Sequence, residues 1–192
     1  MEVAGVPSRA EGDTSHLRDG VARDLVKHAY LVGDFLLSSG SRSKYYFDKY
    51  LFETKPHILR PLGKLLAAEI PDYVDRIAGP ELGAVALATA ASLETGIPFV
   101  IVKKVSKDYA TQKLIEGEIH PGERVVVLED VMTTGTQAIV SAEKLRSMGM
   151  EVLFILGIVD REEGARANVE AAGFEFRSLF TRGELESYLQ KE

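Results

Sequence analysis

The chain has 192 residues, of which 45% are hydrophobic and 27% charged; this composition suits one globular domain with a substantial core and excludes a largely disordered chain. It contains no cysteine, which excludes a disulfide framework, a thiolate metal site and a thiol nucleophile, and which is compatible with a cytoplasmic protein. The formal net charge of -6 argues against a nucleic-acid partner, and no apolar run approaches the roughly 20 residues that cross a bilayer.

The N-terminal part of the chain changes character several times. Residues 1–16 lack a cationic segment followed by an apolar core, so we expect a flexible leader rather than a secretory signal. Apolar residues at helical spacing predict an amphipathic helix over residues 17–32. Residues 33–52 combine short apolar pieces, a Ser/Gly turn and an aromatic stretch typical of strands. A second helix is predicted over residues 56–70, with Pro61 in its first turns.

From residue 75 onward, strands and helices alternate. This alternation predicts right-handed crossover units and a mostly parallel central sheet with helices on both faces, an α/β fold. We therefore expect a single domain over residues 17–192, in which residues 17–74 form a small N-terminal hood with flanking helices and residues 75–192 form the α/β core. The predicted strands are 75–79, 97–104, 124–130, 151–160 and 174–180, and the predicted helices are 81–96, 136–149, 162–173 and 182–190.

Two adjacent acids, Glu129 and Asp130, end the apolar strand 124–130. Ligands bind at the carboxyl ends of parallel strands, and a loop of small and hydroxyl residues that opens a helix offers free N–H groups to a phosphate. Acids beside such a loop suit a phosphorylated sugar, because their carboxylates can accept hydrogen bonds from the sugar hydroxyls. Alternatively, the acids merely begin a loop and Thr136 caps a helix. The loop consists of Val131, Met132, Thr133, Thr134, Gly135, Thr136 and Gln137.

The segment VVVLEDVMTTGTQ resembles the phosphoribosyl pyrophosphate signature of type I phosphoribosyltransferases. Four more segments, in order, resemble orotate phosphoribosyltransferases: FLLSSGSRSKYYFD, GPELGAVALATAASLETGIPFVIVKK, KDYATQKLIEGE and VDREEG. The resemblance implies the type I phosphoribosyltransferase fold and the synthesis of orotidine 5'-monophosphate and pyrophosphate from orotate and phosphoribosyl pyrophosphate, a step of pyrimidine biosynthesis. It also implies a cytoplasmic homodimer with shared active sites, and Mg2+ held mainly by the pyrophosphate of the substrate.

The same resemblance implies roles in donor binding. Glu129 and Asp130 would hold the ribose hydroxyls, and the loop 131–137 would hold the 5'-phosphate. A lysine cluster alone favours a solvated loop, but here it follows a strand that ends near the expected anion site, where cations could stabilise the departing pyrophosphate. By resemblance, the residues that contact the donor there are Lys103, Lys104, Lys107 and Tyr109, and the catalytic set is Lys104, Lys107, Glu129 and Asp130.

For orotate, the resemblance points to Tyr46, Phe47, Thr133 and Arg161. The first two would lie beside the orotate ring, although an aromatic triplet by itself favours core packing. Arg161 could bind the orotate carboxylate with its planar fork, although an arginine after a strand usually forms a surface ion pair. Together these residues would give the site a preference for a carboxylated pyrimidine.

Several positions depart from the pattern of the family. Lysine stands at 103 where arginine is frequent, which keeps the charge but loses the bidentate fork. The other departures are Ser38, Leu82, Gly83, Tyr109 and Ala110. The histidines show no ligand spacing along the chain and receive no metal or catalytic role; they are His16, His28, His57 and His120.

Two rival functions remain open. The first is a phosphoribosyltransferase for another base, such as a purine. The second is a regulatory protein that senses phosphoribosyl pyrophosphate and binds RNA or DNA, which the net negative charge and the lysines disfavour.

Overall fold

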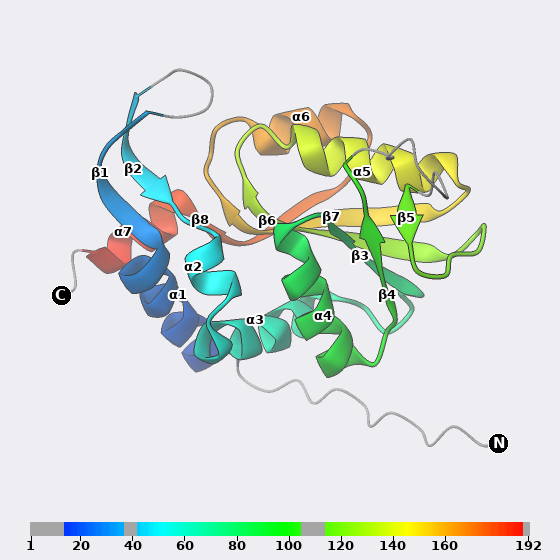
Figure 1. The fold of residues 1–192 in the computed structure, drawn as a ribbon, viewed down its shortest axis with the longest axis horizontal. Helices are drawn as coiled ribbons and strands as arrows, with labels where there is room; N and C mark the ends of the chain where they lie inside the picture. The colour runs from blue at the N-terminus through cyan, green and yellow to red at the C-terminus, as the bar shows by residue number, and fades with distance from the viewer. Residues whose placement is uncertain (1–13, 37–41, 105–113, 190–192) are drawn as a thin grey trace.

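The structure, a computed structural model, describes residues 14–36, 42–104 and 114–189. Its strands form a six-stranded sheet in the order β5-β4-β3-β6-β7-β8 and a separate two-stranded sheet, β1-β2 (Figure 1). The strands are β1 (Tyr30–Leu36), β2 (Arg42–Phe47), β3 (Arg76–Pro80), β4 (Phe99–Val102), β5 (Ile115–Glu116), β6 (Arg124–Met132), β7 (Glu151–Asp160) and β8 (Phe176–Thr181). The helices are α1 (Ser15–Ala29), α2 (Tyr50–Glu53), α3 (Pro56–Glu69), α4 (Gly83–Thr95), α5 (Thr136–Ser147), α6 (Ala165–Ala171) and α7 (Arg182–Leu189).

The central sheet is parallel except at one edge. The pairs β3-β4, β3-β6, β6-β7 and β7-β8 are parallel, as the alternation predicted. The short strand β5 was not predicted and pairs antiparallel with β4. The apolar run in β6 is buried throughout, because helices cover both faces of the sheet there.

Helices cover both faces of the sheet, which confirms the predicted fold class. In Figure 1, α5 and α6 lie on one side, while α1, α3, α4 and α7 lie on the other. The core is correspondingly split into two clusters, one beneath each helical layer. No helix in the described part of the chain is long and apolar enough to cross a membrane.

The N-terminal segment differs from the prediction in two places. The first helix ends at Ala29 rather than at residue 32, because Tyr30 begins a strand that pairs with β2. The aromatic stretch is split between β2 and the short helix α2, which was not predicted. The hairpin β1-β2 projects beyond the central sheet on the side of α7 (Figure 1).

The order of the strands creates a switch point beside β3. The chain passes from β3 to β4 on one side, and later returns to β6 on the other side. In such sheets the crevice at the carboxyl ends of the two diverging strands is the usual ligand site. The strand β6 also continues to Met132, two residues beyond the predicted end, so the acid pair lies inside the strand rather than at its last two positions.

Candidate active site

A cavity of about 300 Å³ opens at this switch point. The ends of β3 and β6, the residue Lys104 after β4 and the start of α5 line it, together with Lys49 from the N-terminal segment. Segments far apart in the sequence therefore meet where the acid pair and the threonine loop were predicted to act. The lining residues from the predicted donor site are Lys104, Glu129, Asp130, Val131, Met132, Thr133, Thr134, Gly135, Thr136 and Gln137.

The threonine loop leads directly into α5. Thr136 is the first residue of that helix, Gly135 is its N-cap, and no side chain caps it, so the alternative in which Thr136 is a capping residue is wrong. Gly135 has φ of +76°, and an added Cβ would lie 3.0 Å from Val169 Cγ2, so glycine is needed here. The free N–H groups and the positive end of the helix dipole at this point suit a phosphate.

The two acids of the pair have different surroundings. Asp130 is 3% exposed; its Oδ2 accepts a hydrogen bond from Lys49 Nζ at 2.7 Å, and its Oδ1 accepts one from the Val131 N–H at 2.6 Å. Glu129 is partly exposed, and burial together with repulsion by Asp130 raises its pKa to about 8. One acid is thus bound to a cation from another segment, whereas the other is the more open of the two.

The lysines after β4 do not share one location. Lys104 lines the cavity, and its backbone N–H donates to Glu81 at 2.6 Å. The side chain of Lys103 is not part of the cavity wall and pairs instead with Glu116 at 3.1 Å. Lys144 on α5 donates to the carbonyls of both lysines, at 2.6 Å and 3.0 Å, so it fixes the backbone where β4 ends.

Lys107, Tyr109 and Ala110 lie outside the described residues, as does Ser38. Their predicted contributions to donor binding therefore remain predictions.

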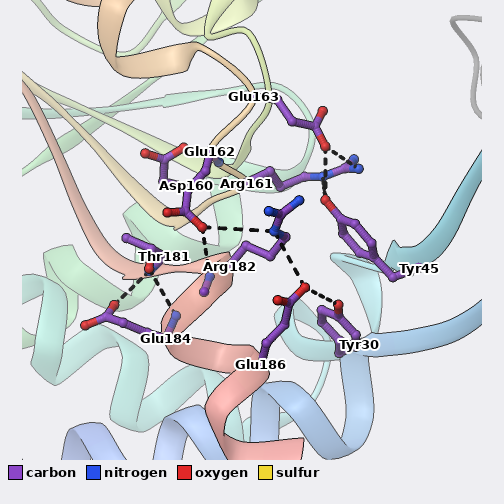
Figure 2. A network of polar contacts seen from close by, with 11 residues as sticks. Tyr30, Tyr45, Asp160, Arg161, Glu162, Glu163, Thr181, Arg182, Glu184 and Glu186 are labelled. Carbon is purple, nitrogen blue, oxygen red and sulfur yellow. Dashed lines mark hydrogen bonds and ion pairs between the residues drawn. The ribbon is translucent and has the colours of Figure 1, made fainter.

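The Arg161 side chain contacts the hairpin and does not line the cavity. It is 7% exposed, its Nε donates to the Tyr45 hydroxyl at 3.2 Å, and its Nη2 lies 2.8 Å from a carboxylate oxygen of Glu163 (Figure 2). The Tyr45 hydroxyl in turn donates to Glu163 at 3.0 Å. The Arg161 backbone N–H donates to the Met132 carbonyl at 2.9 Å, which places the residue next to the threonine loop. Its fork is close to the site but already contacts a carboxylate.

Further contacts fix Tyr45 in this position. Its ring stacks on Tyr30, with centroids 5.3 Å apart, and Arg182 lies over its ring at 5.6 Å (Figure 2). The Tyr30 hydroxyl donates to Glu186 on α7 at 2.9 Å, and burial together with this bond raises the pKa of Tyr30. The hairpin is thereby tied to the C-terminal helix.

The two aromatic residues expected beside orotate point to opposite faces of β2. Phe47 is 6% exposed and packs edge-to-face on Phe52 and Tyr30, at 5.9 Å and 6.2 Å between centroids. Tyr46 is 40% exposed and lies 5.6 Å from the ring of Phe35. Core packing therefore describes the Phe47 ring, whereas the Tyr46 ring faces solvent.

Four polar residues in or beneath the site were not predicted from the sequence: Lys49, Glu53, Glu81 and Lys144. Lys49 and Glu53 are four residues apart around a helical turn, a spacing that could have indicated a shared face. Glu81 and Lys144 had no local pattern that singled them out, because their partners are backbone groups brought near by the fold.

The structure also brings together two of the histidines that seemed scattered. The rings of His28 and His57 are 5.4 Å apart, and potential ligand atoms of these residues and Asp24 lie within 4.8 Å of one another. Lys55 Nζ is 3.1 Å from His28 Nδ1, and burial followed by the charge of Lys55 lowers the pKa of His28. A lysine ammonium already occupies this cluster, so its geometry does not support a metal role.

Comparisons with known proteins show the family of the chain. A model of the phosphoribosyl transferase domain matches residues 54–173. The chain is 47% identical to an orotate phosphoribosyltransferase of Methanocella arvoryzae over 160 residues, which cover 83% of this chain and 91% of the relative. It is 40% identical to that of Synechocystis sp. over 174 residues, covering 87% and 88%.

Solved structures show the same likeness. The orotate phosphoribosyltransferase of Aeropyrum pernix superposes with a TM-score of 0.80 at 33% identity, covering 90% of this chain and 99% of that one. The Mycobacterium tuberculosis enzyme in complex with phosphoribosyl pyrophosphate gives a TM-score of 0.74 at 30% identity, covering 88% and 99%. The chain belongs to the orotate phosphoribosyltransferase family.

Proposed function

We propose that the protein is an orotate phosphoribosyltransferase, which transfers the phosphoribosyl group of phosphoribosyl pyrophosphate to orotate and contributes to pyrimidine nucleotide synthesis. One observation carries this proposal: a single cavity joins an acid pair, an uncapped helix N-terminus and a lysine at the switch point of the sheet. An acid pair suits ribose hydroxyls, and a helix N-terminus suits a phosphate. The high identity to curated relatives over most of the chain supports the same activity.

The reaction is a displacement at the anomeric carbon. The ring nitrogen of orotate forms the new bond to that carbon, while the bond to the pyrophosphate oxygen breaks and its electron pair leaves with pyrophosphate. Glu129 and Asp130 hold the ribose hydroxyls, and N–H groups of the loop 131–137 hold the 5'-phosphate. Orotate that binds already deprotonated at the attacking nitrogen needs no general base. Because the charges are placed before the reaction, they stabilise the transition state without reorganising.

Cations balance the negative charge that grows on the leaving pyrophosphate. The position of Lys104 on the cavity wall supports this role for it, and Lys107 and Tyr109 are expected to add to it. Lys103 is expected to contribute when its side chain leaves Glu116. Mg2+ supplies further neutralisation of charge when it is bound.

The carboxylates that line the cavity suit a metal held chiefly by substrate. Among the described lining residues, Asp130 is bound by Lys49, Glu81 accepts the Lys104 N–H and Glu129 accepts the Asp130 N–H, so few carboxylate oxygens at the cavity are left for a metal. Such a sparse set of protein oxygens fits Mg2+, which usually keeps waters and phosphate oxygens as most of its ligands.

Selection of orotate is assigned to Arg161, Thr133, Tyr46 and Phe47. Thr133 is on the cavity wall, and Arg161 follows the neighbouring strand. Because Arg161 Nη2 lies 2.8 Å from Glu163, the orotate carboxylate would compete with the glutamate for the arginine fork. A base without a carboxylate could not do so, which gives a physical reason for discrimination against uracil.

A panel of bases tests the activity. Purified protein with phosphoribosyl pyrophosphate and Mg2+ is supplied with orotate, uracil, adenine or xanthine, and pyrophosphate release is measured. We expect turnover with orotate and at least 10²-fold less with the others, because a site built for a polar group rejects analogues that lack it. Turnover with a purine and none with orotate would contradict the proposal. Arg161→Ala should raise the orotate KM with little change in the donor KM.

We also infer that the protein is a cytoplasmic homodimer without a nucleic-acid partner. Support for a dimer comes from an apolar groove between α3 and α4, about 400 Å³ in volume, beside which Leu93 is 82% exposed. An exposed apolar surface of this kind is typical of a subunit contact. Light scattering should give a dimer mass for the native protein and for the control Val32→Asp, and a monomer mass for Leu93→Asp. A native monomer at micromolar concentration would contradict this inference.

A further inference from the structure

Beneath the acid pair lies a buried polar cluster that the proposed mechanism does not use. Lys49 and Glu53, at the two ends of the first turn of α2, both reach Asp130 on β6. Glu53 is 4% exposed and Asp130 is 3% exposed, while the Lys49 side chain is 31% exposed. The N-terminal segment thus adds a cation and a third acid to the pair Glu129 and Asp130, which is predicted to hold the ribose hydroxyls.

The two buried carboxyl groups are packed against the same glycine. A Cβ at Gly83 would lie 1.9 Å from Asp130 Oδ2 and 2.6 Å from Glu53 Oε1. These oxygens therefore both face the first residue of α4. The absence of a side chain at this position is what lets both carboxyl groups fit.

The hydrogen bonds of this cluster are incomplete when all its acids are ionised. Asp130 has donors on both oxygens, from Lys49 and from the backbone of Val131. Glu53 Oε1 is buried and has no hydrogen-bond partner among the described residues. Two carboxylates cannot satisfy one another because each only accepts, but a protonated carboxyl group becomes a donor. A proton on Glu53 would therefore turn an unsatisfied contact with Asp130 into a hydrogen bond.

The surrounding charges favour that proton. Burial is the largest influence on the pKa of Glu53, followed by repulsion from Asp130; with the nearby Glu129 these effects raise that pKa to about 8, against the opposing effect of Lys49. These charged groups come from α2 itself and from β6, and the first turn of α4 adds no ionisable side chain. One ammonium faces three acids, and the pKa of Glu129 is raised as well, so the three acids are not all ionised near physiological pH.

We propose that Glu53 is a positioning residue for donor binding: it carries a proton at neutral pH, donates it in a hydrogen bond to Asp130, and with Lys49 fixes the acid that holds ribose. The proposal rests on the proposed role of Asp130 in the donor site. Loss of the proton at alkaline pH adds the negative charge of Glu53 next to Asp130, which turns the Asp130 carboxylate away and weakens donor binding. Residues of the N-terminal segment thereby set the pH range in which the donor site is complete.

Two variants of Glu53 separate its proton from its bulk. Glu53→Gln keeps the size and a permanent N–H donor, whereas Glu53→Ala removes both. Glu69→Gln, an exposed acid on α3, is the matched control. Calorimetry measures the affinity for phosphoribosyl pyrophosphate with Mg2+ from pH 6.5 to pH 9.5, so the result does not depend on turnover of orotate.

The native protein and Glu69→Gln should lose about tenfold in donor affinity between pH 7 and pH 9, beyond the change that titration of the donor itself produces. Glu53→Gln should stay within about twofold over the same range after the same correction, and Glu53→Ala should already be about tenfold weaker at pH 7. A Glu53→Gln profile that follows the native one would overturn the proposal.

Carbon-13 NMR of side-chain carboxyl groups gives a second readout on the ligand-free protein, with Glu53→Gln identifying the signal. A titration midpoint near neutral or alkaline pH supports the proposal, and a midpoint at the ordinary acidic value for glutamate overturns it. This readout remains decisive if Glu53→Ala does not fold. If donor binding is absent in the native protein, the proposed function fails, whereas a failed pH dependence with normal donor binding refutes only the role of Glu53.

Discussion

Gly83→Ala tests the packing beneath the donor site with the smallest possible change. The new Cβ would lie 1.9 Å from Asp130 Oδ2, whereas real Cβ atoms essentially never approach another atom closer than 3.0 Å. The carboxylate must therefore move by about 1 Å or more, or the start of α4 must shift. Asp130 is 3% exposed and bonded to Lys49, so neither movement leaves its hydrogen bonds intact.

The size of the effect follows from these contacts. Overpacking a close-packed interior costs about 1–3 kcal/mol, and parting a buried carboxylate from its cation costs up to about 3–5 kcal/mol. Lys49 is partly exposed and can follow the carboxylate, so we expect about 2–3 kcal/mol in all. For a chain of this length, that lowers the melting temperature by roughly 4–12 °C. The donor KM should rise about tenfold, since a displaced Asp130 no longer meets the ribose hydroxyls.

Gly20→Ala is the matched control. Gly20 lies in α1, and an added Cβ would meet nothing within 4 Å. Alanine in a helix interior is about 0.5–1 kcal/mol more favourable than glycine, so the melting temperature should rise by about 1–4 °C with an unchanged donor KM. Thermal unfolding followed by circular dichroism, with initial rates at varied donor concentration, measures both effects. A Gly83→Ala protein with native stability and native donor KM would refute the packing argument.

Three other changes test separate parts of the structure. Glu163→Gln removes the carboxylate that competes for Arg161. The orotate KM should fall by up to about fivefold, because a partly exposed ion pair contributes only about 1 kcal/mol or less; an unchanged or higher KM would show that the contact does not compete with substrate. Lys144→Met removes the bonds that fix the end of β4, and kcat should fall by about tenfold with little loss of stability; native kcat at saturating substrates would argue against this role. The Arg124 hydrogen bonds lower the pKa of Asp75 to about 2. The ionised Asp75 therefore stabilises the fold above its ordinary pKa, near 4, and this stabilisation is lost as the pH falls toward 2. The melting temperature of Asp75→Asn should be lower than the native value near pH 6 and converge with it at pH 2; a constant difference across this range would contradict the linkage.

The sequence alone determined the class of fold. Alternation of strand and helix patterns from residue 75 onward required a parallel sheet covered on both faces, because continuous apolar strands have no stable place elsewhere. The acid pair and the Thr/Gly loop were also readable as one motif, since they are adjacent in the chain, and the structure brings them to one cavity. The prediction of the fold class succeeded because hydrophobic periodicity depends on near neighbours.

Residues whose partners are distant in sequence could not be predicted in this way. The difference between Glu129 and Asp130 arises because Lys49 and Glu53 reach only one of them across the fold. Likewise, the contact of Arg161 with Tyr45 depends on where the hairpin lies against the sheet. Burial and charge at a site are sums over neighbours in space, so the chemical state of each acid was decided by the tertiary structure. The resemblance that suggests the ligand, by contrast, lies in one local motif.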